Sequence, residues 1–260
     1  MLEVLKNTTY RHLFLAQVIA LIGTGLITIA LALQAYDIAK EQAAQVLGIA
    51  LAIKMIAYIS VAPIASAFAE RLPRKKVLVG LDVIRALTAL CLPFVTQIWQ
   101  IYILIFILQS ASAAFTPTFQ AMIPDVLPIE EEYTNALSLS RLAYDLENII
   151  SPMLAGLLLT VMSYHNLFLG TVVGFIGSAL FVVSAKLPNA KMPEFIGVYN
   201  RIKQGAKIYF RTPRLKALLA LNLAIASASA VVIVHTVFLV QTTFELTEQA
   251  TTWAFGLFEL

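Results

Sequence analysis

The chain has 260 residues, of which 60% are hydrophobic and 13% are charged, about half the charged fraction of a soluble domain. This composition excludes an ordinary soluble domain and predicts a chain that lies mostly within a membrane. The net charge of +3 gives no indication of a nucleic-acid partner, and the single cysteine, Cys91, excludes an intrachain disulfide or a zinc site built on cysteines.

The first long apolar run predicts a membrane helix over about 13–36. It has no charged residue, is about twice as long as the hydrophobic core of a signal peptide, and is followed by no small-x-small cleavage site. The short polar segment 1–11 before it suits an interfacial helix. After it, we expect an outer loop that contains Asp37, Lys40 and Glu41.

Two further apolar runs, at about 45–69 and 76–96, predict helices that are joined by a short basic turn. The turn contains one carboxylate and four cations: Glu70, Arg71, Arg74, Lys75 and Lys76. Each Arg or Lys inside a bilayer costs about 2.5–3.5 kcal/mol on insertion scales. We therefore expect the turn to stay in the cytoplasm, which places the N-terminus there too and sets the alternation of every other helix.

Two long spans without charged residues are each too long for one crossing, which takes ~20 residues. The first is broken by a turn at 96–100 and yields a helix over about 98–122. The second is broken at 163–166 and yields helices over about 136–162 and 166–187. Between the helices predicted at 98–122 and 136–162 we expect an acidic inner loop with Asp125, Glu130, Glu131 and Glu132.

A basic segment over 188–216 precedes a seventh predicted helix at about 217–241. Part of this segment is typical of a helix on the membrane surface, because its apolar residues share one helical face. These residues are Val198, Ile202, Ala206 and Tyr209. Of the 18 Lys and Arg residues, Lys40 alone falls in a predicted outer loop, and Lys54 and Arg85 lie well inside predicted helices. This bias supports the expected orientation.

An eighth helix is expected to begin after Glu248 and to remain incomplete. Residues 249–260 rise only about 18 Å as a helix, which is less than the ~30 Å of the hydrocarbon core. The alternation pattern therefore predicts further helices that this chain does not contain.

The basic turn resembles the loop signature of the major facilitator superfamily between helices 2 and 3, G-x-L-A-D-R-x-G-R-K-x-x-L. The matching residues are Glu70 at the Asp position, Arg71 at the Arg position, and Arg74 and Lys75 at the basic pair. Two glycines of the signature are replaced, by Ser66 and Pro73.

A second segment, 148–156, resembles the G-P-x-x-G-G element of drug:proton antiporters. Its matching residues are Ser151, Pro152, Ala155 and Gly156. The segment 117–125 and the linker before 217 are similar to the branch that contains macrolide-efflux and siderophore-export carriers. From its own residues alone, the 152–156 region is as well explained by a bend and close packing of the helix.

The resemblance implies an all-α membrane fold of the major facilitator type and proton-coupled export of a small, often amphipathic molecule by alternating access. It implies a bacterial inner-membrane location, with the lipid bilayer, a small-molecule substrate and protons as partners. Family members have two six-helix halves. We therefore expect a six-helix half at 1–187, a linker at 188–216 and the start of the second half at 217–260. Helices 1, 2, 4, 5 and 7 would approach the pathway, whereas helices 3 and 6 would face lipid more.

Three interpretations stay open. The chain is either an exporter, or a truncated and inactive remnant of one, or a half-transporter that needs a partner to supply the missing C-terminal half. The sequence contains no zinc-protease, nucleophile-elbow or phosphate-loop pattern, and its three histidines are scattered. We therefore expect no enzymatic activity, no cofactor and no metal site.

Ionisable residues inside a membrane helix are costly, so each needs a partner or a task. Lys54 and Tyr58 share one helical face, and Lys54 is either a cation of the pathway or a lysine that extends to the outer interface. Asp82 and Arg85 are three apart, which favours an internal pair, joined to the basic turn, over a transport role. His235 is either a titratable pathway group or a neutral, hydrogen-bonded residue.

The fifth predicted helix contains three ionisable residues near its start. Arg141 and Asp145 are i,i+4 neighbours and are expected to pair. Glu147 points to another face, with Ser151 one turn further on, and burial would favour its protonated form. Glu147 and then Asp145 are the candidates for proton coupling. The competing interpretation is a salt network of all three residues at the cytoplasmic end of the helix.

Overall fold

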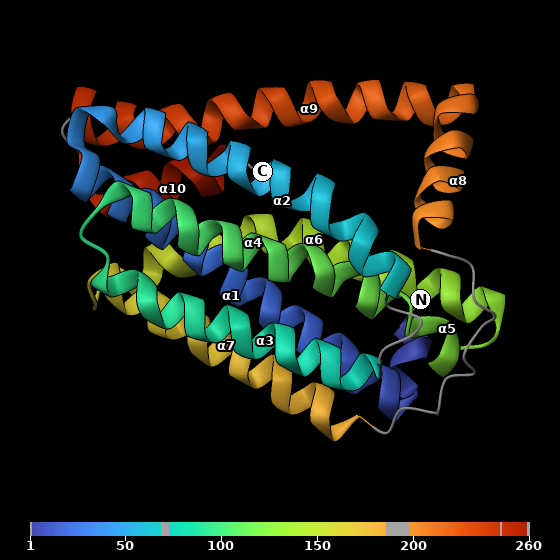
Figure 1. The fold of residues 1–260 in the computed structure, drawn as a ribbon. Coiled ribbons are helices and arrows are strands. Elements are labelled where there is room, and N and C mark those ends of the chain that lie inside the picture. The colour runs from blue at the N-terminus through green and yellow to red at the C-terminus, as the bar shows by residue number, and fades with distance from the viewer. Residues whose placement is uncertain (1, 69–72, 186–197, 245, 259–260) are drawn as a thin grey trace.

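The computed structural model describes residues 2–68, 73–185, 198–244 and 246–258, and within these ranges the secondary structure is entirely helical (Figure 1). Six helices form the main bundle: α1 (Thr8–Ala39), α2 (Ala43–Phe68), α3 (Arg74–Cys91), α4 (Ile98–Gln120), α6 (Glu130–Leu158) and α7 (His165–Ser184). Shorter or later helices are α5 (Ile123–Val126), α8 (Val198–Arg211), α9 (Pro213–Phe238) and α10 (Glu248–Phe258). The expected all-α bundle is confirmed.

The acidic segment before the fifth predicted helix is not a loop as expected. The three carboxylates of Glu130, Glu131 and Glu132 form the first turn of α6, which begins six residues earlier than predicted. Negative side chains in this place stabilise the positive end of the helix dipole, which the prediction overlooked. The other helices of the bundle begin within about five residues of their predicted starts.

Composition separates α6 from its neighbours. Within the part of the chain that the structure describes, six helical segments are long and apolar enough to cross a membrane: α1, α2, α3, the segment from α4 to α5, α7 and α9. The helix α6, which carries Arg141, Asp145 and Glu147, is not among these six. Its 29 residues would rise about 43 Å, which exceeds the ~30 Å hydrocarbon core, so its length suits a crossing although its polarity is higher.

The long helices run back and forth between two ends of the bundle, which we call the Arg74 end and the Asp37 end (Figure 1). Buried apolar side chains form one cluster near each end. The cluster at the Asp37 end includes Leu33, Leu92 and Phe168, and the cluster at the Arg74 end includes Tyr10 and Phe119. Between the two clusters lies a layer of polar side chains, which holds the candidate site.

Helix α1 packs closely against α7 in the middle of the bundle. A side chain on Gly23 would lie 3.2 Å from the carbonyl oxygen of Thr171 and 3.6 Å from the Cα of Gly174. The Thr171 hydroxyl donates a hydrogen bond to the carbonyl of Gly23 at 3.0 Å. Small residues therefore allow the two backbones to approach, as in other membrane helix pairs.

The helices after residue 198 lie against the outside of the main bundle. Figure 1 shows α9 running alongside α2, with α8 across one end of α9, while α10 packs against α6. A side chain on Gly156 of α6 would lie 2.8 Å from the Thr252 hydroxyl of α10. The apolar side chains of α9 are largely exposed, including Leu221, Leu223 and Val231.

Candidate functional site

Two adjoining cavities lie between α1, α2, α4 and α6. The first, of about 220 Å³, is lined mainly by apolar residues such as Leu31, Val46 and Ile105, and we call it the apolar cavity. The second, of about 360 Å³, is lined by more polar residues, and we call it the polar cavity. The polar residues are Gln17, Thr24, Lys54, Tyr58, Arg85, Ser112, Thr116, Tyr144, Glu147 and Asn148.

Four residues line both cavities and therefore mark where the cavities meet: Thr24, Lys54, Glu147 and Asn148. Lys54 on α2 and Glu147 on α6 interact electrostatically across this junction. Tyr58, one turn after Lys54, also lines the polar cavity. The structure thus places Lys54 and Tyr58 of α2 around the same cavity as Glu147 of α6, a helix distant in the sequence.

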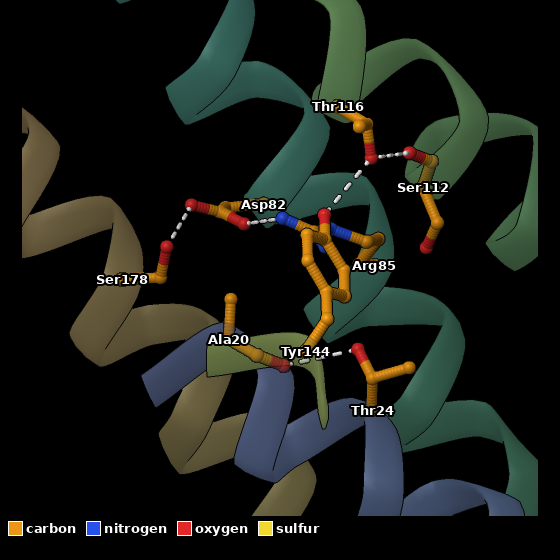
Figure 2. Close-up of polar contacts among 8 residues, drawn as sticks. All are labelled: Ala20, Thr24, Asp82, Arg85, Ser112, Thr116, Tyr144 and Ser178. Carbon is orange, nitrogen blue, oxygen red and sulfur yellow. Dashed lines mark hydrogen bonds and ion pairs between the residues drawn. The ribbon is translucent and has the colours of Figure 1, made fainter. Parts of the chain in front are cut away.

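Asp82 and Arg85 form a buried ion pair on α3 (Figure 2). Their side chains are 0% and 4% exposed, and the Ser178 hydroxyl of α7 donates a hydrogen bond to Asp82 at 2.7 Å. The Arg85 guanidinium lies over the rings of Phe115 and Phe175, at 4.2 and 4.6 Å from their centroids. The pair is internal, as expected, but Arg85 also lines the polar cavity.

Other polar contacts complete the layer around the polar cavity. The hydroxyls of Thr116 and Tyr144 lie 3.3 Å apart (Figure 2). The Ser140 hydroxyl donates a hydrogen bond to the buried side-chain oxygen of Gln17 at 3.0 Å. Sequence reasoning missed all four residues. For Gln17 a signal existed, because an amide inside an apolar run needs a buried partner.

The two carboxylates of α6 that were proton-coupling candidates lie in different surroundings. Asp145 forms an ion pair with Arg141 at 3.1 Å, and both side chains are more than half exposed. Glu147 instead faces the cavities, and its carboxylate lies near Gly25 of α1, where a side chain would collide with Ser151 and approach Glu147 Oε1 to 2.8 Å. Gly25 therefore keeps the space beside Glu147 free of a side chain.

The four matching residues of the antiporter-like segment of α6 are buried. Ser151 and Pro152 line the apolar cavity, Ala155 belongs to the cluster at the Asp37 end, and Gly156 contacts α10. These contacts match the close-packing interpretation of the segment.

The basic turn is described only from residue 73 onward, so the predicted roles of Glu70 and Arg71 lie outside the described residues. Arg74 forms an ion pair with Asp125 and donates to the carbonyl of Ala121 at 2.8 Å. Lys75 donates to the carbonyl of Ala185 at 2.9 Å. The two cations therefore tie the start of α3 to the ends of α4 and α7.

The remaining pathway candidate, His235, has an exposed side chain on α9 and is not among the residues that line the two cavities. The cavity walls come from α1, α2, α4 and α6, which match four of the helices expected to approach a pathway. Helix α3 was expected to face lipid, yet it contributes Arg85. Within the described ranges, no cluster of three His, Cys, Asp or Glu side chains could hold a metal ion.

The sequence of this chain matches a known protein family. The family model described as Major Facilitator Superfamily matches residues 13–260. Macrolide efflux protein A of Streptococcus pyogenes is 27% identical over 177 residues, covering 66% of this chain and 43% of the relative. The MFS-type transporter YfiS of Bacillus subtilis is 28% identical over 158 residues, covering 59% of this chain and 38% of the relative.

A solved structure shares the fold. A variant of the nucleoside transporter NupG superposes with a TM-score of 0.76 at 14% sequence identity, covering 96% of this chain and 64% of that chain. The chain spans about two fifths of the length of the curated relatives it matches.

Proposed function

Because this chain belongs to the major facilitator superfamily, whose members are secondary transporters rather than enzymes, we propose that it serves proton-coupled export of a small amphipathic molecule by alternating access. The chain would supply the six-helix half at 1–187, the linker at 188–216 and the start of the second half at 217–260. The proposal is carried by one observation: the apolar and polar cavities meet at the oppositely charged Lys54 and Glu147.

Glu147 is the proposed proton-coupling residue. It lines both cavities, so a proton on it would change the charge that a substrate meets at the junction. When Glu147 loses its proton, its carboxylate attracts the Lys54 ammonium again. The lysine and a proton therefore compete for the same carboxylate. Asp145 ranks second, because it is exposed and already paired with Arg141.

Arg74 and Lys75 are proposed to act as a latch at one end of the bundle. Their contacts join the start of α3 to Ala121, Asp125 and Ala185, and a change in the tilt of these helices would have to break them. We further propose that this end faces the cytoplasm of a bacterial cell, with the protein in the inner membrane, since the Lys and Arg residues gather there.

The substrate class follows from the relatives and from the cavity lining. The relatives include macrolide efflux proteins, and the apolar cavity next to a polar one suits a molecule with an apolar body and a polar end. We propose a drug-like or siderophore-like amphipathic compound.

The test is uptake into everted membrane vesicles from cells that produce the protein. A panel of amphipathic antibiotics that includes erythromycin is supplied outside, with an acid-inside pH gradient imposed. We expect uptake of at least one compound above that of vesicles without the protein, and loss of this excess when nigericin collapses the gradient. Equal uptake in both vesicle types across the panel, with the gradient present, would overturn the proposal.

A further inference from the structure

Helix α8 and the start of α9 carry positive charge that no nearby carboxylate in the sequence balances. Between Glu194 and Glu245 the sequence contains no acidic residue and six cations: Arg201, Lys203, Lys207, Arg211, Arg214 and Lys216. The side chains of the last five are exposed. Among the described residues none of these five takes part in an ion pair, whereas Lys40, Arg74 and Arg85 each do.

Three of these cations form a stripe along one face of α8, which we call the basic stripe. Lys203, Lys207 and Arg211 follow one another at intervals of four residues, which places them on the same side of a helix. The side chains of Ile208 and Phe210 flank the stripe and are 56% and 59% exposed. Cations beside exposed apolar side chains are typical of a helix at the boundary between lipid headgroups and acyl chains.

The position of α8 in the fold suits this boundary. Figure 1 shows α8 crosswise to the long helices at the Arg74 end of the bundle, and α8 packs against α2 and α9. Both α2 and α9 are long and apolar enough to cross a membrane. A helix that lies crosswise at the ends of membrane-spanning helices lies in the plane of the membrane surface, at the depth of the lipid headgroups.

The charge of the basic stripe selects the kind of lipid. Zwitterionic headgroups carry no net charge and leave the positive charge of the stripe unbalanced. Anionic headgroups attract Lys and Arg side chains near the membrane surface, and each cation adds to the attraction. A nucleic acid would also match the charge, but it would leave Ile208 and Phe210 exposed to water, whereas a lipid surface covers them.

We propose that the basic stripe of α8 is a docking surface for the anionic phospholipids of the membrane. Their phosphates lie against the three cations of the stripe, while Ile208 and Phe210 enter the boundary with the acyl chains. Arg214 and Lys216 extend the same positive surface to the start of α9. Lipid binding at this surface does not depend on which molecule the chain transports, so it goes beyond the proposed function.

The test measures which lipids gather around α8 in nanodiscs that contain the full chain. Gly205 lies two residues from Lys203 and from Lys207, and nothing lies within 4 Å of a side chain added there. In a Cys91→Ala background, Gly205→Cys therefore accepts a bimane fluorophore without a clash. Nanodiscs of phosphatidylcholine and phosphatidylglycerol receive a small, equal fraction of one nitroxide-labelled lipid, either anionic phosphatidylglycerol or zwitterionic phosphatidylcholine. Quenching of the bimane reports how much of each lipid lies near α8.

We expect the labelled phosphatidylglycerol to be enriched about fivefold over the labelled phosphatidylcholine, which corresponds to the attraction of one cation to an anionic surface. High salt should lower this ratio toward one, because salt screens exposed charges. The effect of salt is measured on the parent chain, so it tests the proposal without any change to the stripe.

Two variants with the same loss of charge separate the basic stripe from the overall charge at this end of the bundle. The first replaces the stripe: Lys203→Gln, Lys207→Gln and Arg211→Gln. The matched control replaces three other exposed cations at the same end: Lys6→Gln, Arg11→Gln and Lys76→Gln. The ratio should fall to about one without the stripe, because the local attraction is lost. The control should keep the ratio of the parent.

Three results would overturn the proposal. The first is equal quenching by the two labelled lipids around the parent at low salt. The second is an equal fall of the ratio in the two variants, which would show that any cations at this end attract the lipid. The third is loss of the enrichment when inorganic phosphate is added at constant ionic strength, which would assign the stripe to soluble phosphate instead of a lipid surface.

Discussion

Lys54 on α2 and Glu147 on α6 both line the junction of the two central cavities, where their opposite formal charges attract each other in the interior of the bundle. They are 93 positions apart in the chain. Their proximity therefore depends on the packing of α2 and α6 around α1 and α4. The relationship has consequences for both stability and transport.

Removing one partner of this pair should destabilise the protein more than removing both. Lys54→Gln and Glu147→Gln each leave one charge without its counterpart in a poorly hydrated place, and the double variant leaves none. We expect a coupling energy of about 1–3 kcal/mol in a double-mutant cycle. The measurement is unfolding by sodium dodecyl sulfate in mixed micelles. Additive effects of the two substitutions would show that the two side chains do not interact.

Transport should depend on Glu147 and not on Asp145. Glu147→Gln cannot exchange a proton at the junction of the cavities, so gradient-driven uptake in everted vesicles should fall to the level of vesicles without the protein. Asp145→Asn is the matched control two residues away on the same helix, and it should retain most of the uptake because Asp145 is exposed and paired with Arg141. Equal loss in both variants would refute the assignment of the proton to Glu147.

Gly25 should tolerate no side chain. A methyl group there would collide with Ser151 of α6, so Gly25→Ala should destabilise the protein by about 1–3 kcal/mol through overpacking. Gly80 on α3 is the control, because nothing lies within 4 Å of its expected side chain. Gly80→Ala should be neutral or stabilise by about 0.4–1 kcal/mol. Both are compared by the same detergent titration, and a harmless Gly25→Ala would contradict the packing of α1 on α6.

The Asp82–Arg85 ion pair should contribute to stability because each residue neutralises the charge of the other. Arg85→Met leaves the fully buried carboxylate of Asp82 without its cation and should destabilise by about 3–5 kcal/mol. The double variant Asp82→Asn with Arg85→Gln should recover a large part of this loss. Thermal unfolding in detergent checks both, and a double variant that is no more stable than Arg85→Met would disprove the argument.

The orientation can be tested with a single introduced cysteine. In a Cys91→Ala background, Lys76→Cys should react with a membrane-impermeant maleimide in everted vesicles and stay unlabelled in whole cells. Lys40→Cys, whose parent side chain is 67% exposed at the opposite end of the bundle, should show the reverse pattern. Labelling of Lys76→Cys only in whole cells would invert the proposed topology.

Local contacts were predictable because helical periodicity brings residues three or four apart together. The pairs Asp82–Arg85 and Arg141–Asp145 are both formed, and each follows from spacing along one helix. The existence and approximate limits of the long helices followed equally well from apolar run length and from the placement of Lys and Arg. The start of α6 was mistaken, since three adjacent glutamates resemble a loop although they also suit a helix N-terminus.

Apolar periodicity and charge placement by themselves determined that this is an all-helical membrane chain, because a bilayer restricts which segments can cross it. Only the tertiary structure decided which polar residues share a cavity. Three arrangements join helices that are distant in the chain. Lys54 interacts with Glu147, Gly25 packs against Ser151, and Arg85 of α3 lines the polar cavity. Such contacts depend on how each helix is rotated about its axis, which is set by packing between neighbours rather than by the sequence of any one helix.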